Sequence, residues 1–273
     1  MSLTPFQRNV CRLLAADHIA RGERYVAGGA ALNEILHAQR VSHDVDLFHD
    51  TREAVEISWH TDRETLQQAG MEVQVIREFP TFIEAEVRQN ADGVVLQWVQ
   101  DSAFRFYPLV EHPDFGLALH PFDLATNKVL ALVGRAEVRD WVDVIHCHQT
   151  LQPFGCLVWA TCGKDPGLSP AFILEQASRS AHYAKPEIDT LAYDGQPPDA
   201  AKLGQIWREM LSEAHAIISQ LPETEIGACI LNIDGTLFNG SVDKLQEAIR
   251  QNALYYHQGT IRGAWPTIKP LNV

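Results

Sequence analysis

The sequence predicts an α/β (α+β) protein in two parts, a mixed α/β half over 1–112 and a mainly helical half over 113–273. Two observations lead to this fold class. Short apolar runs of strand length alternate with helix-period patterns as far as residue 112. Beyond it, apolar residues recur at helical spacing in successive long segments. We therefore expect a small mixed sheet with flanking helices, followed by a helical domain.

The first half opens with an expected helix over 4–22. Thr4-Pro5 supplies a good N-cap and a residue suited to the first helical position, and Gly22 is the expected end. Tyr25-Val26-Ala27 then forms a short apolar run that ends at Gly28-Gly29. This pattern predicts a strand and a glycine turn, with a helix over 30–37 after it.

A second strand over 45–48 and a long helix over 52–69 are expected next. Three further strands are expected to follow them. Asp92-Gly93 predicts the hairpin turn between the last two strands. The segment 185–198 is rich in Pro, Asp and Gly and predicts a loop in the second half. The remaining expected elements are strands over 71–76, 81–87 and 94–100, and helices over 122–135, 138–150, 170–184 and 199–221.

Composition excludes several classes of protein. Of 273 residues, 46% are hydrophobic and 21% are charged, as in ordinary globular chains. No apolar stretch approaches the roughly 18 to 20 residues of a membrane span, and the N-terminal residues lack a secretory pattern. We therefore expect a cytoplasmic protein with no membrane partner. A net charge of −13 argues against a general nucleic-acid binder, which needs clustered Lys and Arg.

Cysteine and histidine do not indicate a metal or disulfide framework. The five cysteines are an odd number, are widely spread and form no CxxC pair. His146-Cys147-His148 is the densest group of soft ligands, but adjacent residues on a helix point in different directions. The simpler interpretation is that these are surface and half-buried helix side chains.

The strongest functional signal lies between residues 25 and 50. Gly28 and Gly29 end the first strand, and such glycines let a turn approach phosphate oxygens and present N–H groups at a helix start. Asp44 and Asp46 lie two apart on the next strand and therefore face the same side. Two carboxylates so placed suit magnesium, a hard cation that prefers oxygen ligands and bridges to phosphates.

These residues resemble the nucleotidyltransferase superfamily, and more closely its abortive-infection toxins of the AbiEii/AbiGii type. In that branch an Arg/Ser-rich turn precedes the acidic pair, and Arg40-Val41-Ser42 occupies that place here. Leu47-Phe48 after the pair also fits the pattern. The resemblance implies that Asp44 and Asp46 are catalytic metal ligands, and that Gly28, Gly29 and Ser42 contact the nucleotide.

A second matching motif runs from Phe122 to Val144 on two consecutive expected helices. The resemblance implies that Lys128 holds the nucleotide triphosphate. Asp123 and Arg139 belong to the same nucleotide-binding motif. Asp140 in the closing Arg-Asp-x-x-Asp is either a catalytic base or a structural anchor. The resemblance extends over about residues 24–150.

Each motif alone also has a plain structural interpretation. A Gly-Gly turn is usually structural, and a lone Asp-x-Asp is usually a solvated strand edge. Asp123 could serve only as a helix N-cap. Arg139 and Asp143 have the i, i+4 spacing of a helix-surface salt bridge, worth roughly 0.2 to 0.5 kcal/mol.

The third carboxylate expected of a nucleotidyltransferase is missing from its strand. Gln97 stands where we expect that acid, and an amide is a weaker metal ligand and no base. Asp101 is four residues on, about 13 Å away along a strand. Glu84 and Glu86 share one face of the preceding strand and are the other candidates.

Near the C-terminus, Asn232-Ile-Asp234-Gly-Thr resembles the signature of haloacid-dehalogenase-type phosphatases. That chemistry needs a nucleophilic aspartate at the first position, where this chain has Asn232. The alternative is a simple turn at Asp234-Gly235.

The expected function is therefore nucleotide transfer from a nucleoside triphosphate to an acceptor hydroxyl, with Mg²⁺ or Mn²⁺. The nucleotide is expected in a cleft completed by the helical domain. The resemblance leaves the acceptor open among transfer RNA, protein and small molecules, and includes toxins paired with an antitoxin. The alternative is a nucleotide- or partner-binding module that kept the fold and lost turnover.

Overall fold

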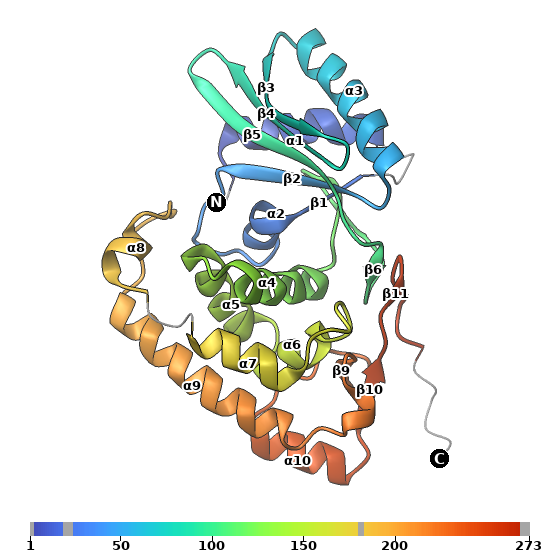
Figure 1. The fold of residues 1–273 in the computed structure, drawn as a ribbon, viewed down its shortest axis with the longest axis vertical. Coiled ribbons are helices and arrows are strands. Elements are labelled where there is room, and N and C mark those ends of the chain that lie inside the picture. The colour runs from blue at the N-terminus through green and yellow to red at the C-terminus, as the bar shows by residue number, and fades with distance from the viewer. Residues whose placement is uncertain (1–2, 19–23, 180–182, 268–273) are drawn as a thin grey trace. The chain divides into compact units, whose positions relative to one another are not determined.

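A computed structural model describes residues 3–18, 24–179 and 183–267, and the chain divides into two compact units (Figure 1). The first unit comprises Met1–Ala103, Leu109–His120 and Ala192–Gly195. The second comprises Phe104–Pro108, Pro121–Leu191 and Gln196–Val273. The chain thus crosses between the units several times.

The first unit is built on a mixed seven-stranded sheet in the order β3-β4-β5-β2-β1-β8-β7. The β3-β4-β5 meander is antiparallel, β5 joins β2 in parallel, and β1 pairs antiparallel with β2 and parallel with β8. The strands are β1 (Tyr25–Ala27), β2 (Asp44–His49), β3 (Glu72–Phe79), β4 (Phe82–Gln89), β5 (Asp92–Gln100), β7 (Val110–His112) and β8 (Gly116–Ala118).

Helices α1 (Pro5–His18) and α3 (Arg52–Gln68) cover one face of this sheet, and α2 (Gly28–Ile35) follows β1 directly and packs on β2 and β1 (Figure 1). Thr4 caps α1 as predicted, because its Oγ1 accepts the N–H of Gln7. The predicted end at Gly22 lies outside the described residues. Trp59 of α3 meets Trp98 of β5 edge to face at 4.8 Å between ring centroids, which anchors the helical layer to the sheet.

The hairpin between β4 and β5 corrects one prediction. The turn is Asn90-Ala91, since Gln89 pairs with Asp92, and Asn90 adopts a φ of 57°. The expected Asp92-Gly93 turn instead forms the first residues of β5. Asn tolerates the left-handed region that a two-residue hairpin requires, so the asparagine rather than the glycine sets the register.

The second unit is mainly helical. One of its core clusters joins α6, α9, α10 and β9, and includes Trp159, Ile217 and Leu245. No helix in the described part of the chain is long and apolar enough to cross a membrane. The helices are α4 (Pro121–Arg135), α5 (Val138–Thr150), α6 (Phe154–Thr161), α7 (Pro170–Arg179), α8 (Lys185–Asp189), α9 (Ala200–Ile218) and α10 (Val242–Arg250).

Two small sheets complete the second unit. β9 (Cys229–Asn232) pairs with β10 (Leu254–His257), and β6 (Phe104–Arg105) pairs with β11 (Thr260–Ile261). Asp234-Gly235 forms the predicted turn after β9, with Gly235 at a φ of 88° and its N–H donated to the carbonyl of Asn232. The segment expected to be a loop, 185–198, contains the short helix α8.

Candidate active site

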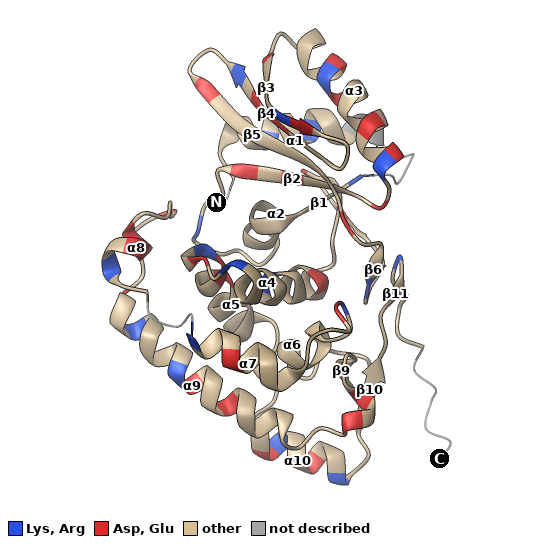
Figure 2. Cartoon of the chain, in the orientation of Figure 1, with Lys and Arg blue, Asp and Glu red and all other residues tan. Residues whose placement is uncertain are grey.

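Strand β2 presents the two acidic residues on one face. Along Asp44–His49, half-buried and buried positions alternate, so Asp44 and Asp46 share the face away from α1 and α3. Val45 and Leu47 point into the core beneath them and are at most 2% exposed. The buried side chains of the strand therefore hold both carboxylates on one face, as the sequence predicts. Figure 2 shows the acidic positions on β2 and on the neighbouring meander.

Gly28 lies directly against Asp46. It has a φ of 65°, and a Cβ added there would overlap the Asp46 carboxylate. Glycine is therefore needed both for its backbone conformation and for the space that the carboxylate occupies. Gly28 is also the first residue of α2, so its turn brings the Asp46 carboxylate to the N-terminus of that helix.

The Arg40-Val41-Ser42 turn closes around the other glycine. A Cβ added at Gly29 would lie 2.6 Å from Nη2 of Arg40 and 3.1 Å from Oγ of Ser42. The Ser42 hydroxyl donates to Oδ1 of Asp44 at 2.8 Å. Ser42 thus orients the first acid, and the buried Arg40 guanidinium places a positive charge beside the glycine turn.

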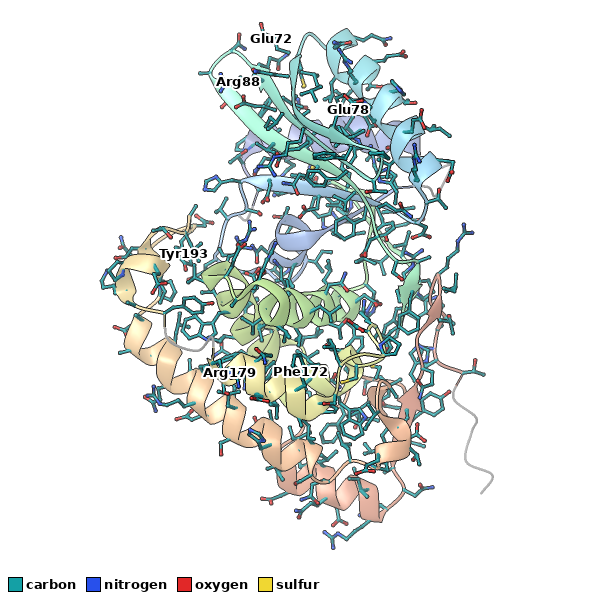
Figure 3. The ribbon with its side chains drawn as sticks, in the orientation of Figure 1. Glu72, Glu78, Arg88, Phe172, Arg179 and Tyr193 are labelled. Carbon is teal, nitrogen blue, oxygen red and sulfur yellow. The ribbon has the colours of Figure 1, made fainter. Side chains whose placement is uncertain are left out.

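Two segments distant in sequence hold this turn in place. The side-chain amide of Gln7 donates to the carbonyl of Ser42 at 2.8 Å. The N–H of Val41 donates to the carbonyl of Ala192, and the N–H of Asp194 donates to the carbonyl of Gln39. Tyr193, labelled in Figure 3, forms a β-bridge with Arg40. The sequence carried no signal for the contribution of 192–195, because nothing in that segment marks a pairing partner.

Gln97 occupies the position on β5 at which a third carboxylate was expected. Gln97 is the direct register partner of Asp46 on β5, and Glu84 is the partner of Gln97 on β4. Nε2 of Gln97 donates to Oε1 of Glu84 at 2.9 Å. Asp46, Gln97 and Glu84 therefore form one row across three neighbouring strands, with the amide in the middle.

The other two candidates for that acid lie elsewhere. The N–H of Asp101 pairs with the carbonyl of His49, at the end of β2 opposite to Asp44. Glu86 is in the row of Asp44, but Val95 stands between them. Glu86 also pairs with Arg88 at 2.8 Å.

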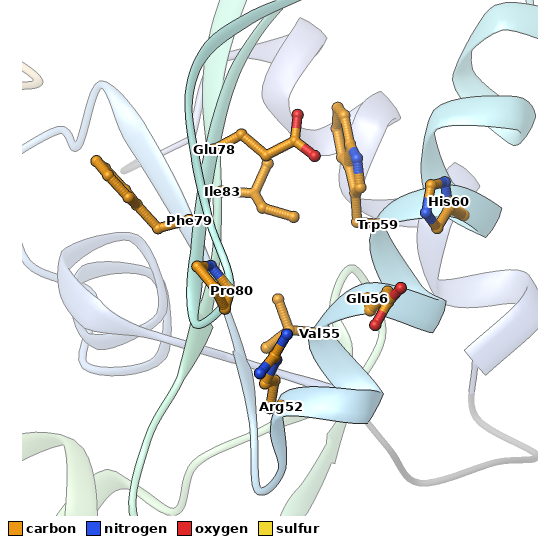
Figure 4. A pocket seen from close by; sticks show the side chains of 9 residues that line it. All are labelled: Arg52, Val55, Glu56, Trp59, His60, Glu78, Phe79, Pro80 and Ile83. Carbon is orange, nitrogen blue, oxygen red and sulfur yellow. The ribbon is translucent and has the colours of Figure 1, made fainter.

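Among the described residues of the first unit, cavities open beside α3 and beside the β4-β5 hairpin. One of about 300 Å³ lies between α3 and the β3-β4 turn, where Trp59, Val55 and Ile83 line it from the helical face of the sheet (Figure 4). The other, of about 500 Å³, borders the start of β2 at the β4-β5 hairpin. It is lined by His43, Glu86, Arg88, Asn90, Ala91, Asp92, Gly93, Val94 and Val95.

The acidic pair fits a magnesium ion that is also bound by phosphate. No group of three or more His, Cys, Asp or Glu side chains in the described residues is arranged to hold a metal by itself. Magnesium commonly takes only one or two carboxylates, and water and substrate phosphates fill its other positions. Asp44 and Asp46, beside a helix N-terminus, are a donor set of that kind.

The downstream motif forms a buried ion network in the second unit. Nζ of Lys128 lies 3.1 Å from Oδ1 of Asp140 and 3.0 Å from Oδ2 of Asp143. Arg135 donates to both oxygens of Asp140, at 2.7 and 3.0 Å. The two carboxylates are at most 1% exposed. These contacts tie α4 to α5.

Electrostatics in this network favour the anchoring role of Asp140 over that of a base. Burial alone raises the pKa of Asp140, but the hydrogen bonds and charges of Arg135 and Lys128 outweigh it and hold the pKa below its ordinary value. A carboxylate with a depressed pKa is a weak proton acceptor. The role of Lys128 in binding triphosphate stays a prediction.

Asp123 and Arg139 also have defined partners. The Asp123 carboxylate accepts the N–H groups of Phe106 and Tyr107 and pairs with Lys164 at 2.8 Å. Since α4 begins at Pro121, Asp123 lies in the first turn of the helix and is not its N-cap. Nε of Arg139 lies 2.6 Å from Glu137. Arg135 lies within the downstream motif but was given no role from the sequence, and Lys164 lies outside that motif.

No protein-family model matches the sequence, and the comparison with curated proteins found no match. The fold does have solved relatives. It is similar to MenT4, a nucleotidyltransferase toxin from Mycobacterium tuberculosis, with a TM-score of 0.51 at 16% identity over 80% of this chain and 83% of that one. It is equally similar to JHP933 from Helicobacter pylori, with a TM-score of 0.51 at 12% identity over 80% of this chain and 95% of that one. The chain therefore shares the fold of these two solved structures.

Proposed function

We propose that the chain transfers a nucleotide from a nucleoside triphosphate to an acceptor hydroxyl, with Asp44 and Asp46 as ligands of Mg²⁺ or Mn²⁺. The observation that carries the proposal is the packing of the Asp46 carboxylate against Gly28 at the start of α2. A metal held there would lie next to backbone N–H groups suited to phosphate. Ser42, which orients Asp44, supports the same assignment.

The reaction is an in-line displacement at phosphorus. The acceptor oxygen bonds to the α-phosphorus, and the bond from that phosphorus to its bridging oxygen breaks. Pyrophosphate leaves with the electron pair, and the hydroxyl proton passes to a base or to solvent. The metal, when bound, neutralises phosphate charge and stabilises the leaving group. Gly29 and Arg40 would contact the phosphates from the glycine turn.

The biological role that we propose is that of a toxin paired with an antitoxin in the cytoplasm. The likeness to MenT4, a nucleotidyltransferase toxin, supports it. The acceptor stays open among transfer RNA, protein and small molecules. A net charge of −13 weighs mildly against a polynucleotide acceptor, which a basic surface would bind better.

The experiment is incubation of the protein with each α-labelled nucleoside triphosphate and Mg²⁺ or Mn²⁺, with pyrophosphate release and label transfer as readouts. Asp46→Asn keeps the shape against Gly28 and removes the charge, so we expect activity to fall at least 100-fold. Glu72→Gln is the matched control, because Glu72 lies on the edge strand β3 of the same sheet and faces Arg88 (Figure 3).

The alternative function is nucleotide or partner binding without turnover, which Gln97 in place of an acid favours. Tight binding of nucleotide with no product, for every acceptor offered, would establish the binding module. Product formation that Asp46→Asn leaves intact would refute the assignment of the metal site.

A further inference from the structure

We propose that Gln97 replaces the third carboxylate as an oxygen ligand of the metal, and that Glu84 orients it for this role. The inference rests on the proposed function, since it assigns a further ligand to the site of Asp44 and Asp46. All the side chains involved lie on the face of the sheet that carries Asp44 and Asp46. This arrangement gives a role to Glu84 of β4, which lies in the same row as Asp46 and is separated from it by Gln97 of β5.

Register places Gln97 next to the acidic pair. Its strand β5 runs parallel to β2, and Gln97 is the partner of Asp46. Neighbouring strands lie about 4.8 Å apart, so the Gln97 amide is within a side-chain length of the Asp46 carboxylate. Glu84 is on the far side of Gln97, one strand further from the metal ligands. Glu84 itself is therefore too distant to complete the same coordination shell.

The hydrogen bond to Glu84 decides which end of the amide faces β2. A carboxylate can only accept, so Gln97 must turn its NH₂ group toward Oε1 of Glu84, and the distance is 2.9 Å. The carbonyl oxygen occupies the other branch of the planar amide and is left for the side of β2. Neutral oxygen is a ligand that magnesium and manganese accept.

A second contact keeps Glu84 in this arrangement. Its other oxygen, Oε2, lies 3.4 Å from Nε of Arg77 on β3, and the Glu84 side chain is 13% exposed. The carboxylate thus has one oxygen for the guanidinium and one for the amide. In Glu84→Gln the oxygen would stay with Arg77, and an NH₂ group would face Gln97. Gln97 would then turn its own oxygen toward position 84 and present NH₂ to the metal.

Binding of Mn²⁺ alone, followed by EPR of the unbound ion, tests this without relying on turnover. Glu84→Gln should weaken Mn²⁺ binding about tenfold, the usual effect of losing an outer-shell partner. Gln97→Met, which is similar in size and lacks the oxygen, should weaken it as much. Glu72→Gln removes the same charge from the same sheet face and should leave Mn²⁺ affinity unchanged.

The double variant Glu84→Gln/Gln97→Glu provides a rescue that no purely structural role predicts. Its position-84 amide can donate to one oxygen of the new carboxylate, and the other oxygen then faces the metal. We expect Mn²⁺ affinity at least equal to that of the wild type.

The proposal is overturned if the wild type does not bind Mn²⁺, if Glu84→Gln matches Glu72→Gln, or if Gln97→Met binds like the wild type. Its failure is separable from that of the proposed function. The expected Mn²⁺ pattern without any nucleotide transfer would refute only the function. Transfer that depends on Asp46 but not on Glu84 or Gln97 would refute only the ligand.

Discussion

Gly28 lacks a Cβ, and both its backbone conformation and the position of Asp46 in the proposed metal site require this. Gly28→Ala would force a Cβ into the Asp46 carboxylate at a φ of 65°. We expect the free energy of unfolding to fall by more than about 1 kcal/mol. We also expect most of the nucleotide-transfer activity to be lost. Urea unfolding and the transfer assay would measure both effects.

Gly134→Ala is the matched control for that substitution. Gly134 lies within α4, and nothing stands within 4 Å of an added Cβ. Gly134 lies in the last turn of α4, where alanine should stabilise the protein by up to roughly 1 kcal/mol because it loses less conformational entropy than glycine. If Gly28→Ala were as stable and as active as Gly134→Ala, Gly28 would not hold Asp46 in place.

The cysteines give a prediction about single side chains throughout the chain. All five are buried and form no disulfide. Burial raises the pKa of the Cys11 thiol to about 12, and that of Cys162 to about 12. Because the thiolate is the reactive form, a thiol reagent at pH 8 should label the native protein very slowly and all five thiols quickly in denaturant. Rapid labelling of one native thiol would contradict this burial.

At the scale of elements, the α4-α5 pair depends on a buried ion network. Asp140→Asn removes one of the carboxylate charges beside Lys128 and Arg135, so we expect a loss of about 3 kcal/mol at pH 7. Chemical unfolding of wild type and variant would measure it. A neutral effect would mean that the network does not join the helices.

The same substitution has a defined pH dependence. The pKa of Asp140 is lowered in the folded protein, so its contribution is complete above the unfolded pKa near 4 and is lost as pH falls through the folded value. The stability difference between wild type and Asp140→Asn should therefore be constant from pH 7 to about 5 and shrink below pH 4. A difference that grew on acidification would contradict the sign of the shift.

Regular patterns explain why many elements were predictable. Apolar and polar residues alternate along β2, β4 and β5, and β1 is an apolar run that ends at a glycine pair. Helices α3, α4 and α5 each have one apolar face. These patterns identified the elements. The missed helix α6 is buried along its whole length and therefore has no polar face to create a period. The missed strands have two to four residues, which is shorter than a period-2 pattern needs.

Some residues of the candidate site were likewise predictable from local sequence, and others were not. Asp44, Asp46 and the glycines were identified because local spacing alone places them together. The partners of Gln97 required sheet order, since β5 lies between β4 and β2 only after the chain has crossed over. The buried pairing of Lys128 with two carboxylates likewise depends on how α4 and α5 pack, which no single-helix pattern contains.

At the scale of the whole molecule, the two units exchange segments of chain. Phe104–Pro108 belongs to the second unit, where β6 pairs with β11, and Phe106 and Tyr107 are at most 4% exposed. Ala192–Gly195 returns to the first unit and pairs with 39–41. A single cut cannot therefore separate the units without leaving a segment of each with the other.

This exchange predicts how fragments behave. A fragment of residues 1–120 would expose Phe106 and Tyr107 and lack the segment 192–195 that pairs with the Arg40 turn, so it should bind a hydrophobic dye and unfold without a sharp transition. Co-expressed with 121–273, it should co-purify, because each fragment carries a segment that completes the other. Size-exclusion chromatography and thermal unfolding of the pair would measure this. If both fragments were separately folded, cooperative and unable to associate, the exchanged segments would contribute little to either unit, and the turn at Arg40 would need no support from 192–195.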